Sequence, residues 1–123
     1  MAAEESHTLP KAERLCGQTA VSALLQHGKT GVEGCLRYRY LPGGGEVSRI
    51  LVSVPKRSFR RAVKRNLLKR RIREAYRVQK HLLSAPVDIQ FIYIAPDVLP
   101  FEDIFRSVGQ CLTACHSERS EES

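Results

Sequence analysis

Twelve lysines and arginines crowd into the stretch from Lys56 to Lys80, which contains a single acidic residue, Glu74. The formal charge of this stretch is +11, whereas the rest of the chain carries eight basic and twelve acidic residues and a charge of −4. Arginine suits phosphate because its planar guanidinium group can bind two oxygens at once. A concentrated basic segment on an acidic body indicates a polyanionic partner, with nucleic acid as the first candidate and an anionic membrane surface as the second.

Helical spacing divides this basic segment into two faces. A merely solvated helix usually alternates charge signs to gain i,i+4 pairs, and here only Glu74 offers one. We expect one arc to pack in the core and the opposite arc to bind the polyanion. The expected core arc is Leu67, Leu68, Ile72, Ala75, Val78, Leu82 and Leu83. The expected binding residues are Asn66, Lys69, Arg70, Arg73 and Arg77, with Lys56, Arg57, Arg60, Arg61 and Arg65 leading into them.

Two tyrosines form a second candidate site on a predicted strand over Cys35 to Leu41, where the residues alternate in period two. Tyrosine can stack on an unpaired base and keeps a polar tip, so this strand face could line a cleft for a single strand, closed by a neighbouring helix. Aromatic residues at strand spacing are equally typical of a core, and both interpretations stay open. The candidate cleft residues are Val21 and Leu25 of the helix and Tyr38 and Tyr40 of the strand.

The sequence contains no set of residues that would form a protein active site. No Ser-His-Asp set, carboxylate pair or phosphate-binding glycine loop is visible, and Gly43 to Gly45 is interpreted as a turn. Cys111, Cys115 and His116 have helical spacing that could hold a metal, but without a fourth ligand nearby the two cysteines are interpreted as small core residues. We therefore predict no catalytic residue and no metal ligand in the protein itself.

Chain length and hydropathy indicate how many domains to expect and whether the protein spans a membrane. A chain of 123 residues, 42% hydrophobic, is expected to form one globular domain, which we place at 9–115 between a frayed N-terminus at 1–8 and a disordered polar tail at 116–123. No apolar run approaches the ~18–20 residues that span a bilayer, and the first ten residues lack a signal-peptide pattern. A cytoplasmic protein without a membrane partner is expected.

The hydrophobic periodicity predicts an α+β fold. A helix over Gln18 to His27, closed by Gly28, precedes the strand at Cys35 to Leu41, and we expect a hairpin from this strand to a second one over Val47 to Val54. The basic segment is predicted as the longest helix, and Val87 to Ile94, apolar on both faces, as a central strand. Pro100 begins the last helix, whose expected core residues are Phe101, Ile104, Phe105, Val108, Leu112 and Cys115.

The segment SVPKRSFRRAVKRNLLKRRIREAYR, from Ser53 to Arg77, resembles the bacterial ribonuclease P protein component. The resemblance lies in a basic pair after a strand, then Ala62-Val63, Arg65-Asn66, Lys69-Arg70 and Arg73-Glu74 followed by an aromatic residue and Arg77. The order of elements agrees over 13–112. Three departures stand out: Leu67 replaces the third residue of the usual Arg-Asn-Arg triplet, Val21 and Leu25 replace phenylalanines of the first helix, and a glycine before Ala62 is missing.

The resemblance implies a two-layer α/β sandwich with the order α-β-β-(β)-α-β-α and a left-handed crossover, a hand that sequence pattern alone would not predict. It implies that the chain is the protein subunit of ribonuclease P, whose large catalytic RNA removes the 5′ leader of precursor tRNA. Mg²⁺ is then held mainly by the RNA, the ten basic-segment residues bind RNA, and Val21, Leu25, Tyr38 and Tyr40 hold the leader. No obligate protein partner is evident.

Two other functions share the basic helix. A ribosomal type of RNA-binding protein would bind folded RNA without a role in cleavage, and comparing precursor with mature tRNA as ligands separates it from the first interpretation. A DNA-binding protein would insert the helix into a major groove, but the apolar half of this helix ties it to its own domain.

Overall fold

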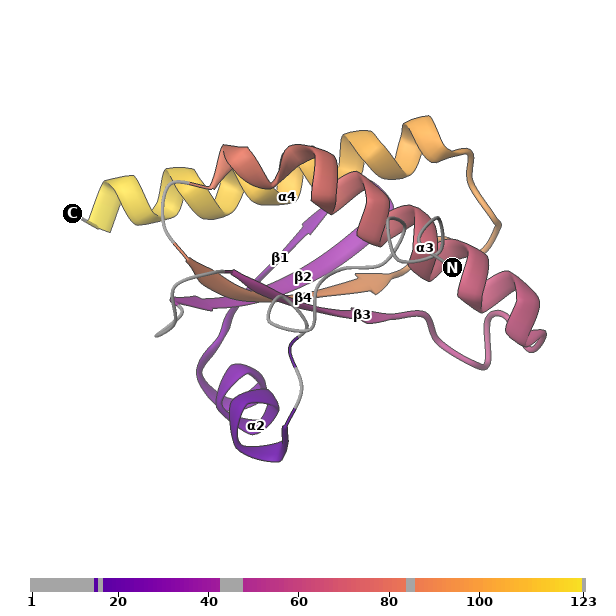
Figure 1. The fold of residues 1–123 in the computed structure, drawn as a ribbon, viewed down its shortest axis with the longest axis horizontal. Helices are drawn as coiled ribbons and strands as arrows, with labels where there is room; N and C mark the ends of the chain where they lie inside the picture. Colours follow the sequence, from indigo (N-terminus) through magenta and orange to yellow (C-terminus); the bar gives the residue numbers. More distant parts are fainter. Residues whose placement is uncertain (1–14, 16, 43–47, 84–85, 123) are drawn as a thin grey trace, which may run out of the picture.

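A four-stranded mixed sheet lies at the centre of the protein, which is described here by a computed structural model (Figure 1). The structure describes residues 15, 17–42, 48–83 and 86–122, so the expected frayed N-terminus at 1–8 and the glycine turn at 43–45 lie outside the described residues. The α+β class and the predicted order of elements are confirmed, including the third strand before the basic helix. The hand of the crossover stays a prediction.

The first helix has the predicted bounds, whereas the last helix is longer than predicted. The longest described helix is α4, with 22 residues against 18 for α3, so the prediction for the basic helix was wrong in this respect. The helix α4 continues to Glu122, beyond the boundary that its apolar pattern predicted at Cys115. The elements are α2 (Gln18–His27), β1 (Lys29–Glu33), β2 (Leu36–Pro42), β3 (Arg49–Ser53), α3 (Ala62–Gln79), the 3-10 helix η2 (Lys80–Leu82), β4 (Val87–Tyr93) and α4 (Phe101–Glu122).

The strand order is β1-β2-β4-β3, and it overturns the expected hairpin between β2 and β3. β2 pairs with β1 and with β4, both antiparallel, whereas β3 pairs with β4 in parallel after the crossover through α3. The hairpin in the structure is β1–β2, turning at Gly34, whose φ of +59° suits glycine. The apolar strand β4 takes the interior position because there it can be buried on both faces, and this position separates β2 from β3.

The two faces of the sheet are covered differently. α3 and α4 lie on one face and α2 on the other (Figure 1). The ring of Tyr76 on α3 lies 6.3 Å from that of Phe91 on β4, which identifies the face below α3. Tyr38 is the register partner of Phe91 and so shares that face. This is the main core; its strand residues are Leu36, Tyr38, Tyr40, Ile50, Val52, Val87, Ile89, Phe91 and Tyr93.

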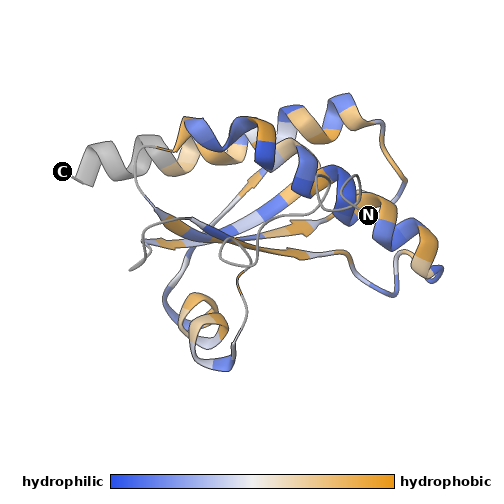
Figure 2. Cartoon of the chain, viewed as in Figure 1, coloured by the Kyte–Doolittle hydropathy of each residue, from blue (hydrophilic) through white to orange (hydrophobic). Residues whose placement is uncertain are grey.

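The helices over the core are amphipathic, with hydrophilic and hydrophobic residues alternating along α3 and α4 (Figure 2). Leu68, Ile72 and Ala75 are buried as predicted, and Tyr76 and Gln79 complete the buried set of α3. Val78 and Leu82, expected in the core, are 45% and 36% exposed. The buried arc is rotated because α3 packs beside α4 as well as on the sheet. In α4, Ile104, Val108, Leu112 and Cys115 are buried as predicted, Phe105 is partly buried, and Phe101 is exposed.

Candidate nucleic-acid interface

The outer face of α3 presents the basic residues that its spacing predicted. Asn66, Arg70 and Arg77 are exposed on the side of the helix opposite its buried residues, and Lys69 and Arg73 flank them, partly exposed. The helix forms in spite of its like charges because Leu68, Ile72 and Ala75 bury the opposite face completely. A row of exposed cations on a rigid helix is an arrangement that can contact successive phosphates.

The segment between β3 and α3 adds four more cations. Lys56, Arg57, Arg60 and Arg61 are all exposed, while Phe59 is buried between them and packs its ring 5.7 Å from that of Tyr93. The buried phenylalanine therefore anchors a turn whose remaining side chains face solvent.

Arg65 differs from the other predicted binding residues. Its Nη1 donates hydrogen bonds of 2.8 Å to the carbonyl oxygens of Phe59 and Arg60, and it is partly buried. This side chain therefore fixes the backbone that leads into α3. Its role in the structure is to hold the backbone at Phe59 and Arg60.

Three cations of the segment were not among the predicted binding residues, namely Lys64, Arg71 and Lys80. The structure gives Arg71 and Lys64 different roles. Arg71 is partly buried and donates from Nη1 to the carbonyl oxygen of Leu99 at 2.7 Å, which ties α3 to the loop before α4. Lys64 is exposed and lines a hollow of about 290 Å³ with Arg60 and Arg61, where these three cations outnumber the carboxylate of Asp97. Lys64 therefore belongs to the basic surface; its position in the first turn, beside two arginines, was the available signal.

Glu74 is the acidic residue of the segment, and it forms an ion pair with Arg77 one turn later. Hydrogen bonding to Glu74, assisted by its charge, raises the pKa of Arg77. The pair lies at the C-terminal end of the basic face, so Glu74 offsets positive charge there and leaves the first three turns strongly basic.

Tyr38 and Tyr40 do not lie where the candidate cleft required them. Their side chains are 3% and 2% exposed and belong to the core below α3 and α4, with ring centroids 6.2 Å apart. The helix α2 lies against the opposite face of the sheet (Figure 1). Both tyrosines are therefore core residues, because large aromatic rings at alternate positions of an interior strand fill the space below two helices.

The other face of the sheet, on the side of α2, is polar and partly open. We call it the α2 face; its strand residues are Arg37, Arg39, Leu41, Arg49, Leu51, Ser53, Asp88, Gln90 and Ile92. Only Asp88 and Gln90 among these are buried, in contrast to the main core. Arg37 and Arg39 alternate with the two tyrosines in sequence, so the period-two pattern already placed them on one face, but it did not show which face is open.

The helix α2 lies on this face and has one buried residue. Leu24 is completely buried, whereas Leu25 is 50% exposed and Val21 partly exposed. A Cβ atom at Gly28 would lie 2.6 Å from Cγ of Arg39, so glycine allows the end of α2 to approach β2. Leu24 is thus the core residue of the helix, and Val21 and Leu25 remain available for a ligand.

The charges of the α2 face are unbalanced. Arg49 donates to both carboxylate oxygens of Asp88, at 2.9 and 2.7 Å, so these two charges compensate each other. Within the ranges that the structure describes, neither Arg37 nor Arg39 forms an ion pair. The face therefore carries excess positive charge beside partly exposed apolar residues, a combination that suits a single-stranded nucleic acid.

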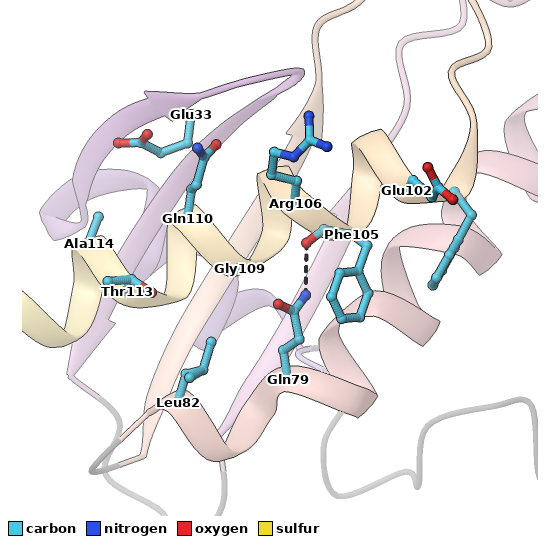
Figure 3. Close-up of a pocket in the computed structure, with 11 residues that line it drawn as sticks. Glu33, Gln79, Leu82, Glu102, Phe105, Arg106, Gly109, Gln110, Thr113 and Ala114 are labelled. Carbon is cyan, nitrogen blue, oxygen red and sulfur yellow. Dashed lines mark hydrogen bonds between the residues drawn. The ribbon is translucent and has the colours of Figure 1, made fainter.

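A separate hollow of about 940 Å³ lies between the end of α3 and α4 (Figure 3), and its lining includes none of the predicted RNA-binding residues. Glu33 and Glu102 bring carboxylates to its rim, and Phe105 and Leu82 supply apolar surface. Across it, Gln79 donates to the carbonyl oxygen of Phe105 at 2.8 Å. Arg106 also lines the hollow, so its charged residues carry one net negative charge, unlike the basic outer face of α3.

The cysteines are part of the packing. Cys35, Cys111 and Cys115 are buried, and burial raises the pKa of the Cys35 and Cys111 thiols. No group of three His, Cys, Asp or Glu residues in the described part of the chain is arranged to hold a metal ion. The described helices also include none that is long and apolar enough to cross a membrane.

Comparisons with known proteins agree on one family. Residues 9–116 match the family described as Ribonuclease P. The chain is 40% identical over 114 residues to a ribonuclease P protein component from Porphyromonas gingivalis, covering 85% of this chain and 83% of that one. It is 38% identical over 87 residues to one from Desulfatibacillum aliphaticivorans, covering 71% and 73%. The solved RNase P protein of Staphylococcus aureus has the same fold, with a TM-score of 0.74, 24% identity and coverage of 85% and 96%.

Proposed function

The chain belongs to the ribonuclease P protein family, and from this premise we propose that it binds the catalytic RNA and the 5′ leader of precursor tRNA and so supports removal of the leader. The observation that carries the proposal is the division of α3 into a buried face and a basic outer face, continued by the cations of 56–61. Membership of the family implies partnership with the RNA of ribonuclease P. The residues that make this contact and the binding of the leader are our proposals.

The RNA-binding surface proposed here comprises the outer face of α3 and the turn before it. Phosphate contacts account for most of the affinity of a basic surface, since each one releases counterions from the nucleic acid. The proposed residues are Lys56, Arg57, Arg60, Arg61, Asn66, Lys69, Arg70, Arg73 and Arg77, as predicted, with Lys64 added; Arg65 acts mainly by positioning the turn.

The leader is proposed to lie along the α2 face. Arg37 and Arg39 can contact its phosphates, while Val21 and Leu25 of α2 and the partly exposed side chains of Leu51 and Ile92 can contact its bases. Leu24 is buried and Gly28 lies close to Arg39 of β2, so the end of α2 packs against this face. The buried tyrosines, Tyr38 and Tyr40, support it from below without contacting the leader.

Catalysis is proposed to belong to the RNA. The described residues include no cluster that fits Mg²⁺, and the acidic side chain of the basic segment is already paired with Arg77. The contribution of this chain is to neutralise phosphate charge where RNA and substrate meet and to hold the leader in place.

The test is reconstitution of the full chain with the large RNA of its own holoenzyme. Precursor tRNA should be cleaved at low Mg²⁺ only when both components are present, and the assembled complex should bind precursor more tightly than mature tRNA. Cleavage by the RNA-free protein would contradict the proposal. Equal binding of precursor and mature tRNA would instead support a structural RNA-binding role.

A further inference from the structure

Gln90 lies in the middle of the α2 face with only one end of its side-chain amide occupied. Its Nε2 donates a hydrogen bond of 3.1 Å to Oγ of Ser53 on the neighbouring strand. Its Oε1 is buried and accepts a hydrogen bond from no residue that the structure describes. The residue is 9% exposed, so water does not readily replace the missing donor. An unpaired buried acceptor costs stability, so folding alone does not account for it.

The second buried glutamine shows the contrast. Gln79 is 8% exposed, and its Nε2 donates to the carbonyl oxygens of Ala75 and Phe105, which joins α3 to α4 (Figure 3). Gln79 therefore has a clear structural role on the far side of the sheet. The Oε1 atom of Gln90 connects no two elements of the described structure, although Gln90 lies on the interior strand β4 and belongs to the partly open α2 face.

We propose that Gln90 is a specificity-determining residue for the leader: its Oε1 accepts a hydrogen bond from a donor on one unpaired nucleotide. The donor is an exocyclic amine of a base or a ribose 2′-hydroxyl group. This inference rests on the proposed function and deepens it, because it names the atom that reads the leader. Because Nε2 donates to Ser53, Oε1 is the atom of this amide that is left to accept a hydrogen bond.

The neighbours of Gln90 suit a nucleotide. Its register partners on the same face are Arg39 of β2 and Leu51 of β3, both partly exposed. An arginine can stack on a base or bind its phosphate, and an aliphatic side chain can contact the base plane. Arg39 is partly exposed beside Gln90, so its guanidinium group can contact the phosphate of a nucleotide that binds there.

The experiment uses the holoenzyme assembled from the full chain and its RNA. Three precursor tRNAs differ only in the leader: all adenosine, all purine riboside, which lacks the 6-amine, or all 2′-deoxyadenosine. The variant is Gln90→Met, of similar length and without the amide, and the matched control is Gln79→Met. Affinities for each precursor and for mature tRNA are measured.

The parent holoenzyme should lose about 2- to 12-fold in affinity when the correct donor is removed from the leader, the range expected for one hydrogen bond. Weaker binding of the purine riboside leader identifies the donor as the base amine, and weaker binding of the 2′-deoxyadenosine leader identifies it as the 2′-hydroxyl group. The Gln90→Met holoenzyme should bind the adenosine leader more weakly by the same factor and no longer distinguish the leaders. The Gln79→Met holoenzyme should distinguish them as the parent does.

Thermal unfolding of the free chains separates a binding role from a structural one. Gln90→Met removes the unpaired acceptor together with the single hydrogen bond to Ser53, and these opposing effects should leave the melting temperature nearly unchanged. Gln79→Met removes two hydrogen bonds and should lower it. The inference would be overturned if the Gln90→Met holoenzyme still distinguished the leaders, or if the parent holoenzyme did not distinguish them. The proposed function would survive either result as long as the parent binds precursor more tightly than mature tRNA. If the parent does not prefer precursor over mature tRNA, the proposed function itself fails.

Discussion

Arg49 of β3 and Asp88 of β4 are joined across a parallel strand pair by two hydrogen bonds, from Nε to Oδ1 at 2.9 Å and from Nη2 to Oδ2 at 2.7 Å. They are register partners, and Asp88 is buried. The pair attaches the outer strand β3 to the interior strand β4 on the α2 face. It also neutralises a carboxylate that would otherwise repel a nucleic acid.

Replacing Arg49 with alanine should therefore destabilise the protein. The variant leaves the carboxylate of Asp88 buried without its partner, and we expect a loss of about 1.5–3 kcal/mol in the free energy of unfolding. The matched control is Arg37→Ala on the same face, which is exposed and should change stability by less than about 0.5 kcal/mol. Urea denaturation measures both. Equal losses for the two variants would show that the Arg49–Asp88 pair has no special role.

The outer face of α3 should affect RNA binding and leave folding intact. Arg70→Ala should weaken binding of the large RNA and flatten the slope of log affinity against log salt by about 0.7–0.9, the change expected for one lost phosphate contact. Its melting temperature should stay near that of the parent. Ile72→Asp should fail to fold, because it buries an unpaired charge. An Arg70→Ala variant with an unchanged salt slope would remove this residue from the interface.

Arg65 should behave differently from Arg70, although both belong to the basic segment. Arg65→Ala removes two hydrogen bonds to backbone carbonyls, so we expect a loss of about 1–3 kcal/mol in stability together with weaker RNA binding. Hydrogen exchange should increase over 58–64 in this variant and not in Arg70→Ala. If exchange there stays at the parental level, the contacts of Arg65 do not position the turn.

The buried tyrosines should act through stability. Tyr38→Ala and Tyr40→Ala should each cost about 3–5 kcal/mol, as large-to-small changes in an aromatic core do. Any loss of affinity should be equal for precursor and mature tRNA. Leu25→Ala, at a half-exposed position of α2, should instead lower affinity for precursor alone and leave the melting temperature nearly unchanged. A precursor-specific defect in a stable Tyr38 variant would restore the tyrosine to the leader site.

Stability should decline in alkaline solution. Burial raises the pKa of the Cys35 and Cys111 thiols and of the Tyr93 hydroxyl group in the folded chain. Below the ordinary values of these groups, near 9 to 10, both folded and unfolded chains are protonated and pH has little effect. Above them the unfolded chain releases protons that the folded chain retains, so the free energy of unfolding falls. Thermal melts between pH 8 and 10.5 measure this; a Cys111→Ala variant should show a smaller decline.

Several features of this protein followed from sequence alone because they depend on local periodicity and charge. The helix at Gln18–His27, the interior strand β4 and the buried positions Leu68 and Ile72 were all predicted. The exposed basic side chains of α3 also followed, since like charges at helical spacing cannot be buried. These features depend only on the order of residues within a single helix or strand.

The pairing of strands required the tertiary structure. A glycine turn between two β-rich segments is an ordinary hairpin signal, yet β4 lies between β2 and β3 because an apolar strand is buried most completely in the interior of a sheet. The role of Tyr38 and Tyr40 depended on the same fact. Period-two alternation places the tyrosines on one face of the strand and Arg37 and Arg39 on the other. It does not predict which face is covered by α3 and α4 and which by α2.

The individual roles of the polar residues were also decided by packing between distant segments. Arg65 and Arg71 look like any other arginine of the segment, and only the fold brings their side chains to the carbonyl oxygens of Phe59, Arg60 and Leu99. Gln90 is, with Asp88, a polar residue in a mostly apolar strand, and only the structure shows that its Nε2 is paired with Ser53 while its Oε1 is unpaired. Sequence determines which side chains carry charge or polarity, whereas burial and partners depend on contacts between residues far apart in the chain.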